Sequence, residues 1–276
     1  MSCGGVARNV AEGLARLGLK TGLVAVFGDD PDGFWLKQRT QWAGVDLALS
    51  LVIPRERTGS YTAVIDENGE MVVAVSDMSL SDGVQAGMLE SRWPEIADSR
   101  LIFLDTNFSS ESIALIARLS AREGKRLCVD AVSTLKASRL PEDLHGLFLL
   151  FCNRDEAGVL TGERIAGEKD ARHAAQRLRD RGAQNVIITL GPQGMMLNAD
   201  GTICVLEAPR VDVFDTTGAG DAMISGVLYG LIRGEPLEFS LRMGRAASAA
   251  ALQSRQSVSV LINPDELYSD ARKDIR

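Results

Sequence analysis

Residues 215–221 read Asp215-Thr216-Thr217-Gly218-Ala219-Gly220-Asp221, a glycine-rich turn set between two carboxylates. Apolar residues then recur at helical spacing from Met223 to Leu231, so we expect the turn to open a helix that holds Asp221 in its first turn. Backbone N–H groups are free at such a helix start and attract anions, while a carboxylate beside them can take a proton from an attacking hydroxyl. The stretch predicts an anion site with a general base, although an ordinary capped helix is an equal alternative for these residues alone.

The other well-known phosphate-binding motifs do not occur in the chain. G-x-x-x-x-G-K-[ST] is absent, and the dinucleotide pattern G-x-G-x-x-G would need glycine at the position of Met223. The set of protein-kinase signatures is also missing. Phosphate chemistry at residues 215–221 would therefore need a different scaffold.

Length and composition favour one large α/β domain with a small appendage. The 276 residues are 45% hydrophobic, enough for a sizeable core. A net charge of -7 and a pI near 5.0 disfavour nucleic acid and an acidic membrane surface as partners, because both call for a basic face. No apolar run approaches the ~20 residues needed to span a bilayer, and no export signal is recognisable, so we expect a cytoplasmic protein.

The cysteines and histidines do not form a recognisable reactive motif. No C-x-x-C pair occurs, which disfavours a zinc site or a disulfide framework. We expect buried thiols at Cys3, Cys128, Cys152 and Cys204. His145 and His173 have no serine or cysteine motif nearby, so hydrolase triads are disfavoured and both are read as structural or surface residues.

Apolar β-rich runs alternate with helical patterns along the chain, which is typical of a mostly parallel sheet with helices on its faces. The predicted buried strands are Leu23–Phe27, Leu101–Leu104, Leu127–Val129, Leu147–Phe151 and Val186–Leu190. The predicted helices are Val6–Leu17, Pro31–Ala43, Ser110–Glu123, Arg154–Thr161, Glu168–Arg181 and Glu238–Leu252, besides the helix that opens at Ala219.

One region breaks this alternation. Leu47–Ile53, Tyr61–Ile65 and Met71–Val75 read as three successive strands, the last two joined by residues 66–70 as a hairpin. We expect a small sheet inserted at residues 45–77. A second hairpin is predicted around residues 199–201, between 194–197 and 202–205.

Four motifs in sequence order give the chain a resemblance to the ribokinase-like (PfkB) carbohydrate and nucleoside kinases. They are Gly4-Gly5-Val6-Ala7-Arg8-Asn9-Val10-Ala11, Asn153-Arg154-Asp155-Glu156, Thr189-Leu190-Gly191-Pro192-Gln193-Gly194 and the stretch at 215–221. The resemblance covers essentially the whole chain. It implies a three-layer α/β/α sandwich, a single kinase domain at 1–276 with a β lid at 45–77, and ATP-dependent phosphoryl transfer to an alcohol.

The resemblance also implies a role for each motif. Asp221 would be the catalytic base and Gly218, Ala219 and Gly220 the anion hole, while Asp215 and Thr217 would help to hold a monovalent cation such as K⁺. Gly4 and Gly5 would let the substrate approach the backbone, and Asn9 would contact sugar hydroxyls. Asn153 and Glu156 would organise Mg²⁺ and its waters, and Thr189, Gly191 and Gly194, with Thr217, would lie on the nucleotide side.

Each shorter motif also has a purely structural interpretation. Asn153 and Glu156 could form a helix capping box, Gly4-Gly5 a simple loop, and Gly191 to Gly194 a turn between strands. Their order, together with the specific stretch at 215–221, favours phosphoryl transfer over four separate coincidences.

Further wording resembles the pseudouridine kinases within this family: Thr58-Gly59-Ser60-Tyr61, Ser76-Asp77-Met78-Ser79, Asp105-Thr106-Asn107 and Val129-Asp130-Ala131-Val132-Ser133. On that resemblance we expect Asp77 and Asn107 to contact the uracil or ribose of the substrate. Two alternatives stay open: a kinase of the same family for ribose, a keto-deoxy sugar acid or another nucleoside, and a non-catalytic binding protein on the same scaffold.

The resemblance departs from the family pattern at its start. Family members carry a first sheet strand and an Asn-x-Asp before the Gly-Gly signature, whereas Gly4 is the fourth residue here. We interpret this as a truncated gene model, or else as a short and impaired protein, and expect the 276-residue form to be weakly stable and to bind substrate poorly. The resemblance also implies that the lid can pair in a homodimer.

Overall fold

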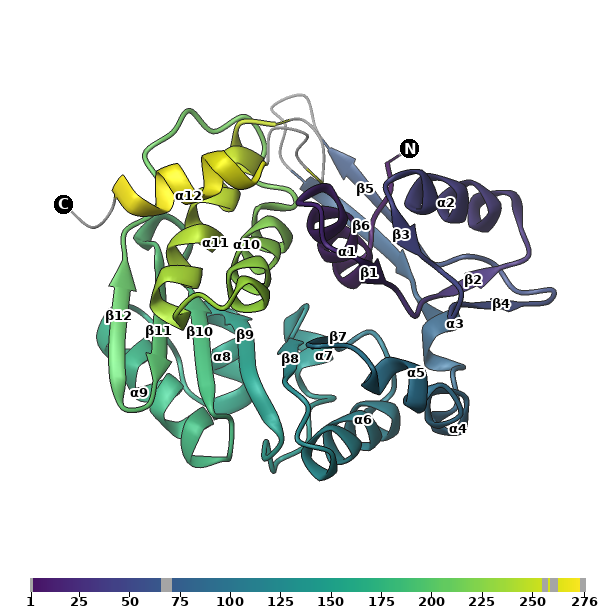
Figure 1. Cartoon of the computed structure of the whole chain (residues 1–276), viewed down its shortest axis with the longest axis horizontal. Helices are drawn as coiled ribbons and strands as arrows, with labels where there is room; N and C mark the ends of the chain where they lie inside the picture. The colour runs from purple at the N-terminus through teal and green to yellow at the C-terminus, as the bar shows by residue number, and fades with distance from the viewer. Residues whose placement is uncertain (1, 66–70, 255–257, 259–262, 274–276) are drawn as a thin grey trace.

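The computed structural model describes residues 2–65, 71–254, 258 and 263–273, and Figure 1 shows their arrangement. Its strands are β1 Thr21–Gly22, β2 Val26–Gly28, β3 Val45–Asp46, β4 Leu51–Ile53, β5 Ser60–Ile65, β6 Met71–Asp77, β7 Ile102–Asp105, β8 Leu127–Asp130, β9 Leu147–Asn153, β10 Asn185–Thr189, β11 Met195–Ala199 and β12 Thr202–Leu206. Its α-helices are α1 Val6–Arg16, α2 Pro31–Trp42, α3 Ser79–Asp82, α4 Ala86–Glu90, α5 Trp93–Ala97, α6 Ser110–Arg122, α7 Thr134–Ala137, α8 Arg154–Thr161, α9 Glu168–Asp180, α10 Ala219–Arg233, α11 Leu237–Leu252 and α12 Pro264–Lys273.

A six-stranded sheet in the order β12-β11-β10-β9-β8-β7 forms the centre of the fold. Strands β7 to β10 are parallel, because α6 and α7 to α9 supply the crossovers between them. Strands β11 and β12 continue the sheet as an antiparallel hairpin, as predicted around residues 199–201. The α/β class with a mostly parallel sheet is confirmed.

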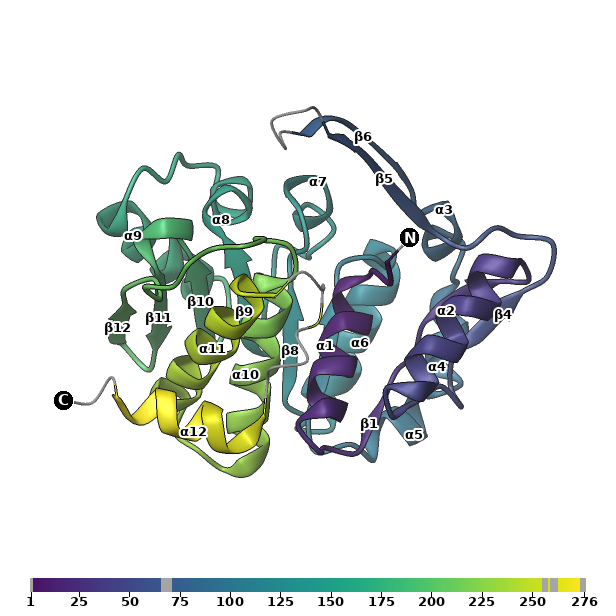
Figure 2. The same cartoon turned by 90° about the horizontal axis from the view of Figure 1, so that it is seen from above.

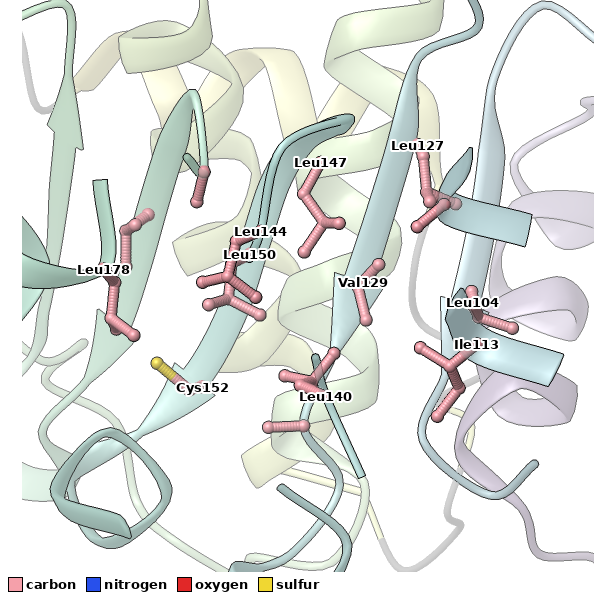
Figure 3. Packing of buried hydrophobic residues seen from close by; sticks show 14 of the residues in the cluster. Leu104, Ile113, Leu127, Val129, Leu140, Leu144, Leu147, Leu150, Cys152 and Leu178 are labelled. Carbon is pink, nitrogen blue, oxygen red and sulfur yellow. The ribbon is translucent and has the colours of Figure 1, made fainter. Parts of the chain in front are cut away.

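Side chains of the buried strands alternate between two apolar cores, one on each face of the sheet. Leu127 and Val129 of β8 point into the core with α6, α8 and α9, seen in Figure 3, whereas Cys128 between them points into the core with α1, α10 and α11. Figure 2 shows the sheet between these helix layers. Burial on both faces explains why these strands read as continuous apolar runs.

The N-terminal part differs from the prediction. Leu23–Phe27 was expected in the main sheet, but β2 begins at Val26 and pairs with β4, while β1 pairs with β3. Of the predicted strand Leu47–Ile53 only Leu51–Ile53 is a strand, β4, and it pairs with β2, so it does not join the hairpin that follows. The physical reason is burial: Leu23, Val45 and Leu47 pack with α1 and α2 in a small separate core.

Within the described residues, the segment predicted to be a lid therefore contains a two-stranded hairpin, β5 antiparallel to β6, which we call the lid hairpin after its predicted role. Its predicted loop at 66–70 lies outside the described residues. The hairpin projects from the body of the molecule (Figure 2). The limits of the domain at 1–276 and of the lid at 45–77 stay predictions.

Two smaller results concern thiols and membranes. Cys128 and Cys152 are buried, as predicted, whereas Cys3 and Cys204 are half-buried, so the expectation was wrong for those two. Among the described residues, no helix has the length and apolar character needed to cross a bilayer.

Candidate active site

Polar side chains end all four parallel strands on the same edge of the sheet. Asp105 ends β7, Asp130 ends β8, Asn153 ends β9 and Thr189 ends β10. The strand register places Asp105 beside Asp130 and Asn153 beside Thr189. Open α/β sheets bind ligands outside the carboxyl ends of their strands. This edge is therefore the natural place for a functional site.

Helix α10 brings Asp221 to this edge. Gly218 forms the helix N-cap with φ +78°, a left-handed conformation that glycine adopts without strain, and its carbonyl accepts from Ala222 N at 2.9 Å. Asp221 lies in the first turn, as expected. Asn9 of α1 donates from Nδ2 to Asp221 Oδ2 at 2.7 Å. The first and last motifs of the resemblance thus meet through a direct hydrogen bond.

Close packing of α1 on α10 makes that bond possible. Gly13 lies one turn after Asn9, and Ser225 lies one turn after Asp221. A Cβ at Gly13 would come within 2.5 Å of Ser225 Oγ, so only glycine allows this approach. Ser225 Oγ donates to Asp221 O at 2.8 Å. The small pair one turn away therefore sets the distance between Asn9 and Asp221.

The surroundings of Asp221 suit it to act as a base near neutral pH. Burial is the main cause that raises the pKa of Asp221 to about 6; the hydrogen bond from Asn9 opposes the rise, Asp105 adds to it, and Arg8 lowers the pKa. A carboxylate with this pKa is ionised at pH 7 yet binds a proton far more readily than an ordinary aspartate.

Asp130 is a functional candidate that sequence reasoning noticed only as part of a likeness. Burial, and then the charges of Glu156 and Asp221, raise its pKa well above the ordinary value. Val132 N donates to Asp130 Oδ2 at 3.0 Å from a backbone with φ +62°, which is unusual for a β-branched residue. Its place at the end of a predicted buried strand was the available signal.

Asp105 was likewise noticed only as part of a likeness, and it organises the residues around it. It is 5% exposed and accepts from Ala7 N at 3.0 Å, at the start of α1, where the free N–H groups favour a carboxylate. Asn107 Nδ2 donates to Asp105 Oδ2 at 2.7 Å, and Lys136 of α7 donates to Asn107 Oδ1. The predicted substrate contact Asn107 is thus fixed between a carboxylate and an ammonium group.

The predicted metal pair forms the capping box that was its structural alternative. Asn153 Oδ1 accepts from the N–H groups of Asp155 and Glu156 at 2.9 Å each, and Glu156 Oε2 accepts from Asn153 N at 2.8 Å. Glu156 is 4% exposed, and burial raises its pKa. Capping and metal binding do not exclude each other, because each carboxylate oxygen has more than one lone pair.

The predicted nucleotide loop follows β10 and contacts the start of α8. Gly191 opens a short 3-10 turn, and Leu190 N donates to Gly194 O at 2.8 Å. Arg154, directly after the cap Asn153, donates from Nη2 to Leu190 O at 3.1 Å and to Gln193 Oε1 at 2.5 Å. This arginine joins the metal motif to the nucleotide loop.

The remaining predicted residues make local contacts. Asp215 Oδ1 accepts from Thr217 N at 2.8 Å. Gly4 and Gly5 are exposed, and Gly5 is the N-cap of α1 with φ +100°. Asp77 is exposed at the end of the lid hairpin, where Ser79 Oγ donates to its Oδ1 at 2.7 Å; this bond is the main cause that lowers the pKa of Asp77. These bonds connect Asp77 to Ser79 and not to the residues around Asp221.

Comparison with known proteins identifies the family of the chain. A model of the pfkB family of carbohydrate kinases matches residues 1–263. The chain belongs to the pfkB family. This pfkB-family kinase is 33% identical to the pseudouridine kinase of Escherichia coli (strain K12) over 263 residues, which is 95% of this chain and 82% of that protein. The activity class of this chain is phosphoryl transfer to an alcohol.

Two ribokinases extend the comparison. The pfkB-family chain is 26% identical to the ribokinase of Haemophilus influenzae over 93% of its own length and 83% of that protein. The solved structure of Arabidopsis thaliana ribokinase, complexed with ribose and ATP, superposes with a TM-score of 0.90, covering 98% of this chain and 87% of that one at 20% identity. The ribokinase-like fold is confirmed.

Proposed function

We propose that this pfkB-family chain is a pseudouridine kinase, which transfers the γ-phosphoryl group of ATP to the 5′-hydroxyl of pseudouridine and yields pseudouridine 5′-phosphate and ADP. The observation that carries the chemistry is the largely buried Asp221 with a pKa of about 6, held by Asn9 at the opening of α10. The substrate rests on the 33% identity to the Escherichia coli pseudouridine kinase.

Asp221 takes the proton of the attacking hydroxyl in this proposal. The new bond forms between the 5′-oxygen and the γ-phosphorus, and the bond between that phosphorus and the β,γ-bridging oxygen breaks, so that ADP leaves. N–H groups of the turn Gly218-Ala219-Gly220 hold the charge on the transferring group. The charge that Asp221 loses on protonation removes a repulsion with Asp105.

A divalent cation would be held at this site largely through water molecules and the phosphates of ATP. No group of three or more His, Cys, Asp or Glu side chains within the described ranges is arranged to hold a metal. Magnesium commonly keeps several waters and binds through one or two carboxylates and the substrate phosphates. Glu156, with Asn153, would hold Mg²⁺ in this way, and the charges of Glu156 and Asp130 would be relieved by it. The ion would supply neutralisation of the phosphate charge.

A monovalent cation, K⁺, is proposed beside the glycine turn. Asp215 and Thr217, joined by their local hydrogen bond, would supply oxygen ligands there. Thr189, Gly191 and Gly194 would face the nucleotide.

The substrate would lie between the start of α1 and the lid hairpin. The ribose would contact Gly4, Gly5 and Asn9, and the uracil ring would contact Asn107 and Asp77. The lid hairpin would exclude water that competes for the phosphoryl group. The hairpin also exposes apolar side chains, Tyr61 at 58% and Val75 at 64%, which would pair two chains in a homodimer.

The second candidate is a kinase for another sugar or nucleoside. The similarity to Haemophilus influenzae ribokinase favours it, since the phosphoryl-transfer residues would serve ribose or a keto-deoxy sugar acid equally well. A non-catalytic binding protein remains the third. The largely buried carboxylate of Asp221 argues against it, because binding alone gives no reason to keep a charge whose burial is costly.

The test is a coupled assay that measures ADP release with pseudouridine, uridine, ribose and a sugar acid at equal concentrations. We expect the highest kcat/KM with pseudouridine and a product phosphorylated at the 5′ position. A higher kcat/KM with another acceptor would select the second candidate. Absence of acceptor-dependent ADP release, with ATP binding retained, would select the third.

A further inference from the structure

An ionic network lies inside α1, directly behind the residue that contacts the base. Arg8 is 7% exposed and Glu12 is 6% exposed, and the Arg8 guanidinium donates to Glu12 Oε2. Arg8 Nη1 also donates to Asn9 Oδ1 at 2.8 Å, and Arg8 Nε donates to Thr40 Oγ1 of α2 at 3.3 Å. A buried arginine thus has one of its nitrogens committed to the neighbouring carboxamide.

The chemistry of its two neighbours leaves the Asn9 carboxamide one orientation. A guanidinium only donates hydrogen bonds, and an ionised carboxylate only accepts them. Asn9 therefore turns Oδ1 toward Arg8 and Nδ2 toward Asp221. The reverse orientation would set Nδ2 against the guanidinium and Oδ1 against the carboxylate, and would lose both bonds.

We infer that Arg8 is a positioning residue, which holds the Asn9 carboxamide with its donor toward Asp221 and so keeps the base ionised and correctly aimed. This inference rests on the proposed role of Asp221 as the base, but it does not depend on which acceptor the kinase uses. Arg8 acts through Asn9 and does not itself touch the reacting atoms.

A purely structural role of the ion pair can be tested separately from the positioning of Asn9, because Arg16 also contacts the Glu12 carboxylate. Arg16 donates to Glu12 Oε1 at 2.7 Å and, among the described residues, makes no hydrogen bond to Asn9, so loss of Arg16 tests the ion pair without the carboxamide. The charged groups around Asp221 are Arg8 on α1, Asp105 on β7 and Asp130 on β8.

The experiment follows the carboxyl carbon of Asp221 by ¹³C NMR across a pH series in the full chain, with the signal assigned by its loss in Asp221→Asn. We expect Arg8→Met to raise the titration midpoint by roughly one pH unit, because the Asn9 donor that stabilises the ionised carboxylate is then no longer held toward it. Arg16→Met should leave the midpoint within about 0.2 pH units of wild type. The readout needs no turnover, so failure of the pseudouridine assay would leave it intact.

A variant in Asn9 decides whether Arg8 acts through the carboxamide. Asn9→Ala should raise the midpoint, and adding Arg8→Met to it should give less than half of the shift that Arg8→Met gives alone, because the amide is already gone. Additive shifts would overturn the inference in favour of direct charge attraction. An Arg8→Met midpoint equal to wild type would also overturn it.

Folding is controlled with a milder variant. Arg8→Lys keeps a positive charge beside Glu12, but one ammonium cannot replace the fork that reaches Glu12, Asn9 and Thr40 together. If Arg8→Met does not fold, Arg8→Lys should still raise the midpoint, and an unchanged midpoint in that variant would overturn the inference.

Discussion

Replacement of Asp221 by asparagine should remove activity and stabilise the fold at the same time. The substitution keeps the shape of the side chain, and an amide oxygen can still accept from Asn9 Nδ2, which lies 2.7 Å from the carboxylate. What is lost is the negative charge and the ability to take a proton. We expect turnover to fall by about 10²–10⁴-fold, the range for loss of a general base.

The effect on stability follows from the pKa of Asp221. Its rise from an ordinary 3.8 to about 6 means that the folded protein holds the proton more tightly than the unfolded chain does. Ionisation therefore costs folding free energy, and the cost grows from about pH 4 to about pH 6 and is complete above that. The rise corresponds to at most about 3 kcal/mol, since the side chain keeps some contact with solvent.

Urea unfolding of wild type and Asp221→Asn at several pH values measures this difference. At pH 4 the carboxyl is protonated in the folded state and about half ionised in the unfolded state, so the two free energies of unfolding should differ by only roughly 0.5 kcal/mol. At pH 7.5 the variant should be more stable by up to about 3 kcal/mol. Asp98→Asn, which removes a carboxylate from an exposed position, is the control for the change in net charge.

Two results would refute this reasoning. Equal free energies of unfolding at pH 7.5 would mean that Asp221 is not penalised by burial. A gain in Asp221→Asn of the same size at pH 4 and pH 7.5 would mean that the amide packs better for reasons unrelated to charge. Normal turnover in the variant would separately remove the base from its role.

Three further substitutions test the metal motif and the nucleotide loop. Arg154→Ala should raise KM for ATP about five-fold with a smaller change in kcat, because the bonds from Arg154 to the nucleotide loop are lost. Arg164→Ala, at an exposed position nearby, is the control. Equal KM values for the two variants would contradict a role of Arg154 in holding the loop. Glu156→Gln should raise the Mg²⁺ concentration for half-maximal turnover while the melting temperature holds, since glutamine can also complete a capping box; an unchanged Mg²⁺ requirement would exclude the metal role. Gly194→Ala should cost about 3 kcal/mol in urea unfolding, because its Cβ would lie 2.0 Å from Leu206 O at φ +91°. Gly191→Ala, with open space at φ +61°, should cost only about 1 kcal/mol, and equal costs would refute the steric argument.

The sequence predicted the longer strands and helices better than the shortest strands. β8 to β10 and α6, α8 and α9 match the prediction to within two residues at each end, because apolar runs and helical periodicity report burial directly. β2 to β4 were assigned wrongly. They are two or three residues long, and their pairing depends on packing against α1 and α2, which no local pattern encodes.

The candidate site shows the same division. Asp221 and Asn153 were predicted from motifs whose residues are adjacent in sequence. Asp105 and Asp130 belong to the site because parallel strands end at one edge, and that edge exists only once the strand order is known. A strand-end carboxylate could have been noted from the sequence, but nothing local shows that it faces Asp221 and not solvent.

The bond between Asn9 and Asp221 joins residues 212 positions apart, and its length depends on residues outside both motifs. Gly13 and Ser225 repeat the spacing of the functional pair one helical turn further on, and their small size lets α1 lie against α10. A larger residue at either position would separate the helices and weaken the bond that moderates the pKa of the base. The proton affinity of Asp221 is therefore a property of helix packing as much as of the glycine turn beside it.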